Sequence, residues 1–84
     1  MNKIRSRFYR RGYSLRKYKK RYYLIIRRND NTCIGAVEPF LNEYGQDELV
    51  VYYRRPQGII GDMIAPEEIT GILTEIETNF IPRP

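Results

Sequence analysis

The stretch Arg21-Tyr22-Tyr23-Leu24-Ile25-Ile26-Arg27-Arg28, followed by Asn29-Asp30-Asn31-Thr32, decides the fold of this 84-residue chain. Tyr, Leu and Ile are typical of strands, whereas Asn and Asp favour turns because they tolerate positive φ. Residues 32–38 return to a strand-like composition. The sequence therefore predicts an antiparallel hairpin, with residues 21–28 as its clearest strand.

The chain after this hairpin predicts one more strand, at residues 48–55, ended by Pro56 because proline cannot donate to a strand ladder. By the same reasoning Pro39 is expected to end the second strand. Residues 40–45 are then expected to form a loop or a single helical turn. Residues 57–65 contain Gly58 and Gly61 and are expected to be a flexible connection.

The last segment predicts a helix that starts at Pro66, where the missing N–H is tolerated, with acidic residues next to the positive end of the helix dipole. One stripe of this helix is apolar, and it contains Ile69, Ile72, Leu73, Ile76 and Phe80. We therefore expect an amphipathic helix laid on the sheet.

Residues 2–11 predict a short helix in which Ile4 and Phe8 share one face, and Gly12 suits the left-handed position that ends a helix. Residues 13–18 predict a short strand. Isolated helices of this length are marginal in water, and like charges weaken this one further. The helix is therefore expected to fold only if Ile4 and Phe8 pack on something or if phosphates neutralise its arginines. The basic segment 1–20 is expected to be partly mobile, and its helix end is the part that we expect to order on contact with a partner.

Together these elements predict a single α+β domain over residues 1–84, with residues 21–80 forming its core. We expect a short basic N-terminal helix, a three- to four-stranded mainly antiparallel sheet and a C-terminal amphipathic helix packed on one face. The predicted core comprises Leu24, Ile26, Ile34, Ala36, Val50, Tyr52, Ile69, Leu73 and Ile76.

The formal net charge of +5 conceals a strong segregation of charge along the chain. No Asp or Glu precedes Asp30, and beyond position 28 only Arg54, Arg55 and Arg83 oppose the ten acidic residues. The residues up to position 28 carry twelve cations: Lys3, Arg5, Arg7, Arg10, Arg11, Arg16, Lys17, Lys19, Lys20, Arg21, Arg27 and Arg28. A surface that serves only solubility mixes both signs, so this segregation points to a polyanionic partner.

Nucleic acid is the polyanion that the residue types favour, because arginine grips phosphate with two hydrogen bonds and aromatic rings stack on unpaired bases. Single-stranded or looped RNA is a sub-hypothesis of this prediction. Tyr13 and Tyr18 are the candidate stacking residues. The predicted phosphate contacts are Arg5, Arg7, Arg10, Arg11, Arg16, Lys17, Lys19, Lys20 and Arg21.

Three alternatives use the same residues. The basic segment could dock on an acidic patch or in the nucleic-acid groove of a host protein. It could also be neutralised by the protein's own acidic residues, either by folding against them or by head-to-tail association of two molecules. A ribonuclease resembling small bacterial messenger-RNA-cleaving toxins, with Arg, Lys and Tyr as catalytic groups, is the third. A negatively charged membrane surface is a weaker option because the apolar face of the first helix is small.

The composition argues against most enzyme chemistry, and we expect a non-enzymatic protein without metal or cofactor. There is no histidine and only one cysteine, Cys33, so no Cys-His pair, Ser-His-Asp triad or zinc cluster can form. The glycines form no nucleotide-binding fingerprint. No apolar run is long enough for a bilayer, and a single cysteine fits the reducing cytoplasm.

The stretch Arg11-Gly12-Tyr13-Ser14-Leu15-Arg16-Lys17, followed by Arg21-Tyr22-Tyr23-Leu24-Ile25 and an Asn-rich turn, resembles a pattern in small basic accessory proteins of bacterial phages and integrative elements. The resemblance covers residues up to about position 37. It implies an accessory factor of a mobile element that acts on nucleic acid or on a host nucleoprotein complex. It brings no activity and no site residues.

Overall fold

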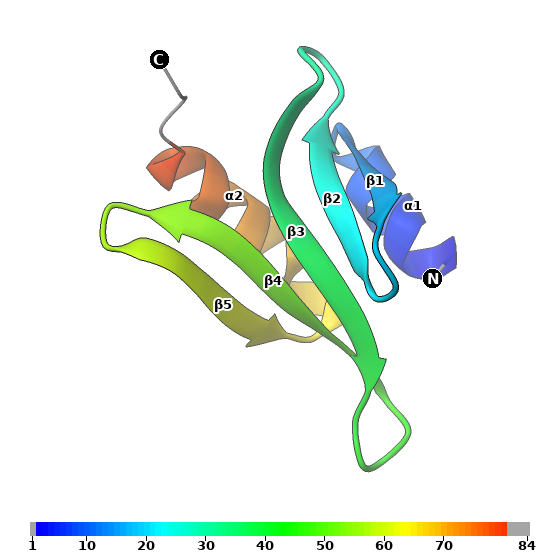
Figure 1. The fold of residues 1–84 in the computed structure, drawn as a ribbon. Coiled ribbons are helices and arrows are strands. Elements are labelled where there is room, and N and C mark those ends of the chain that lie inside the picture. The colour runs from blue at the N-terminus through cyan, green and yellow to red at the C-terminus, as the bar shows by residue number, and fades with distance from the viewer. Residues whose placement is uncertain (1, 81–84) are drawn as a thin grey trace.

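The computed structural model describes residues 2–80 and has two helices and one five-stranded antiparallel sheet. The strands lie in chain order across the sheet, and both helices pack on the same face of it (Figure 1). The elements are α1 (Asn2–Arg10), β1 (Tyr13–Tyr18), β2 (Tyr22–Arg27), β3 (Thr32–Leu41), β4 (Asp47–Arg55), β5 (Gly58–Ile64), the 3₁₀ turn η1 (Pro66–Glu68) and α2 (Ile69–Asn79). The predicted α+β class and both helices are confirmed.

The prediction of three to four strands was wrong because β5 occupies most of the expected flexible connection. Its Gly61 lies directly opposite Tyr52 of β4, and a Cβ atom at Gly61 would come within 3.1 Å of the Tyr52 ring. This glycine therefore makes room for a cross-strand aromatic ring inside a strand. Gly58, with φ +133°, makes the turn from β4 into β5.

Pro39 does not end β3, which runs on to Leu41 and pairs Pro39 with Leu49 of β4. The pairing between β2 and β3 has already ended at Val37. Beyond Val37, β3 therefore has a neighbour on one side only, and a proline without an N–H is tolerated at such an edge. The expected loop over residues 40–45 is shortened accordingly.

The helix-covered face of the sheet holds the core, and the other face is open. In β4 the buried side chains are Leu49, Val51 and Tyr53, whereas Val50 and Tyr52 point to the open face and are partly exposed. The predicted core positions Leu24, Ala36, Val50 and Tyr52 were therefore assigned to the wrong face. Ile26, Ile34, Ile69, Leu73 and Ile76 are buried as predicted.

A bulge in β3 explains why Ile34 is buried although Ala36, two residues later, faces the open side. Ile25 pairs with Gly35, but the next residue, Ile26, pairs with Cys33. Ile34 is thus the extra residue of the bulge, and it joins the core cluster under the helices.

The first helix packs on the sheet through its apolar side. Ile4 and Phe8 are buried in the same cluster as the α2 residues Ile69 and Leu73. Gly12 follows α1 with φ +96°, which confirms its predicted left-handed position. The packing of Ile4 and Phe8 in the core meets one of the two conditions under which this helix is expected to fold, and the partial mobility of the basic segment stays a prediction.

The pairing of β3 with β4 is incomplete. Their register runs from Leu41 opposite Asp47 to Ala36 opposite Tyr52, and no pair joins the strands beyond that point. Residues 32–35 of β3 and 53–55 of β4 therefore diverge at the end of the sheet near the C-terminus of α2, as Figure 1 shows.

Candidate nucleic-acid interface

The predicted phosphate-contacting residues lie together along one side of the molecule. β1 is an edge strand and α1 packs on it, so the cations of the helix, the strand and the following turn come together. We call this surface the basic edge, and it consists of Lys3, Arg5, Arg7, Arg10, Arg11, Arg16, Lys17, Lys19, Lys20 and Arg21. All of these side chains are exposed except Arg7, which is partly buried.

The aromatic ring of Tyr23 in β2 contacts two cations of the basic edge, one from α1 and one from β1. The Arg5 guanidinium of α1 lies 5.1 Å from the centroid of the Tyr23 ring in β2, and the Lys17 ammonium of β1 lies 4.7 Å from the same centroid. Arg5 also donates a hydrogen bond of 2.8 Å to the Leu15 carbonyl. The negative face of the ring offsets the repulsion between the two cations and holds them in fixed positions.

A second pair of a cation and an aromatic ring, which is not among the predicted contact residues, lies at the other end of α1. The Arg28 guanidinium stacks 3.7 Å from the centroid of the Tyr9 ring and donates a hydrogen bond to the Tyr9 carbonyl. The Tyr9 side chain is 57% exposed. The sequence could have indicated this exposed ring, because Tyr9 lies in a basic helix and does not share the buried face of Ile4 and Phe8.

The two tyrosines predicted to stack on bases have different environments. Tyr18 is 46% exposed at the end of β1, with the Lys19 ammonium 5.2 Å from its ring centroid, and it stays a candidate. Tyr13 is only 8% exposed and its hydroxyl donates a 2.9 Å hydrogen bond to Glu77 of α2. Tyr13 is therefore a core residue whose ring is not accessible to a base, and we remove it from the interface.

Burial and the Glu77 carboxylate raise the pKa of Tyr13 to about 12. The same carboxylate accepts a hydrogen bond of 2.7 Å from Arg27, which also pairs with Asp30 at 2.8 Å. The hydrogen bonds from Arg27 lower the pKa of Asp30 to about 2. Arg27 is therefore a structural cation that joins β2 to α2, and its charge is neutralised within the fold.

The basic edge itself is not neutralised by the acidic half of the chain. Within residues 2–80, the only salt bridges join Arg27 to Asp30 and Glu77, and Arg55 to Glu75. The alternative in which the basic segment folds against its own carboxylates thus applies to Arg27 alone among its described cations.

The described part of the chain offers no metal centre and no membrane-crossing helix. Over residues 2–80, no group of three or more His, Cys, Asp or Glu side chains is arranged to hold a metal ion. Both α-helices in that range are far shorter than the ~20 residues needed to cross a bilayer.

Comparison with known proteins gives no relative from which a function could be transferred. No protein-family model matches the chain, and no similar chain was found among curated proteins or solved structures. The function must therefore be argued from the geometry and charge of the molecule.

Proposed function

We propose that this protein binds nucleic acid without catalysing a reaction, and that the basic edge contacts the phosphate backbone. The observation that carries the proposal is the packing of α1 on the edge strand β1. This packing places the cations of three elements side by side, and none of them forms a salt bridge within residues 2–80.

The physical basis is release of counterions from the phosphate backbone. Each Lys or Arg that neutralises a phosphate frees condensed cations, which gives affinity without sequence specificity. A rigid cationic surface loses little conformational entropy on binding. The core contacts of Ile4 and Phe8 hold α1 in place and so supply such rigidity.

Exposed tyrosines beside the cations favour a nucleic acid with unpaired bases. Tyr9 and Tyr18 each lie against a cationic side chain and keep about half of their surface exposed. A base could stack on either ring, at about 1 to 3 kcal/mol for each base. Looped or single-stranded RNA is therefore the first ligand to test.

The test is a titration of the protein with duplex DNA, single-stranded DNA and structured RNA at several salt concentrations. We expect affinity to fall steeply with salt. The double substitution Lys19→Gln and Lys20→Gln removes two exposed cations of the β1–β2 turn, which should lower the salt slope by up to about two contacts. The matched control is Arg54→Gln, which removes an exposed cation on the open face of the sheet and should leave the slope unchanged.

Absence of binding to all three nucleic acids at low salt would refute the proposal. Purification at low salt distinguishes nucleic-acid binding from the alternative function, which is binding to an acidic patch of another protein. Nucleic acid that co-purifies supports the proposal, whereas a stoichiometric protein partner supports the alternative. An equal loss of affinity in the turn variant and in the Arg54 control would show that net charge, and not the basic edge, drives binding.

A further inference from the structure

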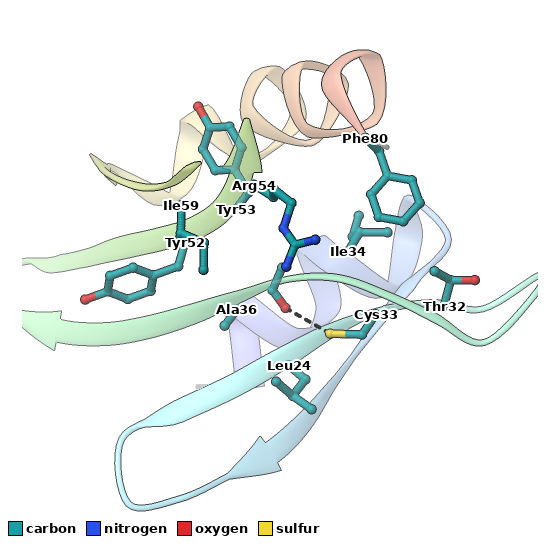
Figure 2. A pocket seen from close by; sticks show the side chains of 11 residues that line it. Leu24, Thr32, Cys33, Ile34, Ala36, Tyr52, Tyr53, Arg54, Ile59 and Phe80 are labelled. Carbon is teal, nitrogen blue, oxygen red and sulfur yellow. Dashed lines mark hydrogen bonds between the residues drawn. The ribbon is translucent and has the colours of Figure 1, made fainter. Parts of the chain in front are cut away.

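A pocket of about 700 Å³ opens in the middle of the sheet, where β3 and β4 diverge. Its walls come from four strands and from the residue that follows α2, as Figure 2 shows. The lining is predominantly apolar and includes Leu24, Ile34, Ala36, Ile59 and Phe80. Pockets of this size and lining are typical of small-molecule sites.

Because β3 and β4 diverge from their last pair, the space between them narrows towards the point where the two strands meet. Ala36 and Tyr52 are the last paired residues, and at the next residue, Gly35, a Cβ atom would lie only 2.7 Å from the Tyr52 carbonyl oxygen. Beyond this contact the strands separate without pairing. A wedge of this kind admits a slender apolar group, whereas an added peptide strand needs a constant spacing of about 4.8 Å to its neighbour.

Among residues 2–80, Arg54 supplies the only charged side chain of the pocket lining. Its guanidinium lies across the opening in Figure 2, and within residues 2–80 it has no hydrogen bond and no salt bridge. The next residue, Arg55, is by contrast paired with Glu75 of α2. The site thus combines an apolar wedge with one cation whose charge is left for a ligand.

We propose that this pocket binds a small apolar carboxylate, with the hydrocarbon body in the wedge and the carboxylate on Arg54. Carboxylate and guanidinium match as a pair of parallel charge-assisted hydrogen bonds, which orients the molecule as well as holding it. The proposal does not depend on nucleic-acid binding, because no residue of the pocket belongs to the basic edge.

Cys33 gives a local readout, since it is the only cysteine of the chain, is exposed and lines the pocket. The probe is decanoate, used below the concentration at which it forms micelles, and the measurement is the rate at which neutral iodoacetamide alkylates Cys33. We expect decanoate to slow alkylation in a saturable manner. Decan-1-ol, which lacks the charge, should protect about tenfold more weakly, the size of one charge-assisted interaction.

Two arginine variants locate the charge that the carboxylate recognises. Arg54→Gln should weaken protection by decanoate about tenfold and leave protection by decan-1-ol unchanged. Arg10→Gln removes another exposed arginine, on α1 in the basic edge, and should change neither. Ile59→Ser, which removes exposed apolar surface from the pocket wall, should weaken protection by both molecules.

Three results would overturn the proposal. The first is an alkylation rate of Cys33 that decanoate leaves unchanged. The second is equal protection by decanoate and decan-1-ol, which would remove the role of the carboxylate. The third is an equal effect of the Arg54 and Arg10 variants, which would show attraction to the net positive charge of the protein. None of these results bears on the salt titration with nucleic acid, so the two proposals can fail separately.

Discussion

Gly35 of β3 lies against the backbone carbonyl of Tyr52 in β4, and this contact leads to a prediction at the scale of one residue. The substitution Gly35→Ala forces a Cβ atom to within 2.7 Å of the Tyr52 carbonyl oxygen, so a strand must shift. We expect a loss of about 1 to 3 kcal/mol in the free energy of unfolding, the usual range for overpacking. Urea unfolding monitored by circular dichroism measures it.

Gly71 is the matched control for that experiment. It lies in the middle of α2, where an added Cβ atom meets nothing within 4 Å. Gly71→Ala should therefore stabilise the protein by about 0.5 to 1 kcal/mol, the helix-propensity difference between the two residues. Destabilisation by both alanines, or by neither, would contradict the close approach at Gly35.

The raised pKa of Tyr13 leads to a prediction of how the stability of the protein changes at alkaline pH. Burial and the Glu77 carboxylate raise its pKa from 10.0 to about 12, so the folded state holds the phenolic proton more tightly than the unfolded state. Tyr13 therefore makes its full contribution to the free energy of unfolding below about pH 10. This contribution, roughly 2 to 3 kcal/mol, is lost as the pH rises towards about 12. Burial also raises the pKa of Tyr52 and of Tyr53, and these add to the loss.

The measurement compares urea unfolding of the wild type and of Tyr13→Phe across this pH range. The variant lacks the titrating hydroxyl and should lose less stability than the wild type between about pH 10 and pH 12. The same alkaline loss in both proteins would show that the bond from Tyr13 to Glu77 does not hold in solution.

At the scale of elements, α1 provides the sharpest test because two neighbouring rings have opposite environments. Phe8 is fully buried under the sheet, whereas Tyr9 is mostly exposed beside Arg28. Phe8→Ala should destabilise the whole domain by about 3 to 5 kcal/mol, and the milder Phe8→Leu by about 1 to 1.5 kcal/mol. Tyr9→Ala should cost less than about 1 kcal/mol, mainly the contact between the cation and the ring.

Thermal and urea unfolding of the three variants decide between a packed and a mobile α1. A mobile helix would make the Phe8 and Tyr9 variants equally stable. Tyr9→Ala is also informative for function, because its exposed ring is a candidate stacking surface. We expect it to weaken binding of single-stranded RNA, by about 1 to 3 kcal/mol if one base stacks there, and to leave the salt slope unchanged.

The elements themselves were predictable where local signals agreed. Gly12 ends α1, the Asn-rich turn joins β2 to β3, and the stripe from Ile69 to Ile76 forms the buried face of α2. β5 was not predicted because a glycine such as Gly61 is normally a sign of a loop. Its place in a strand is explained only by the Tyr52 ring that lies against it. The prediction of β5 failed because the role of Gly61 depends on a side chain of the neighbouring strand.

At the scale of the molecule, the structure separates two positively charged features that net charge alone would merge. The basic edge lies on α1, β1 and the turn after it, whereas Arg54 lies on β4 in the pocket between β3 and β4. Decanoate in the pocket should therefore leave the affinity for nucleic acid unchanged, because the two ligands use different cations. Titration of the same nucleic acid with and without saturating decanoate measures this.

Competition between decanoate and nucleic acid would contradict the separation of the two surfaces. It would show either that decanoate binds to the basic edge or that nucleic acid reaches Arg54. Repeating the titration with Arg54→Gln distinguishes these cases, because competition persists in the variant only if decanoate uses the basic edge.

The amino-acid sequence alone determined the segregation of charge, the α+β class and the two helices, because composition and periodicity are properties of neighbouring residues. It could not determine which face of the sheet is buried, since β4 is apolar on both faces at Val50, Val51, Tyr52 and Tyr53. Only the tertiary structure decided that the helices cover Val51 and Tyr53, that Tyr13 belongs to the core and that Arg27 is neutralised while the basic edge is not. These outcomes depend on contacts between distant segments, such as β1 with α2 through Tyr13 and Glu77, which no local pattern encodes.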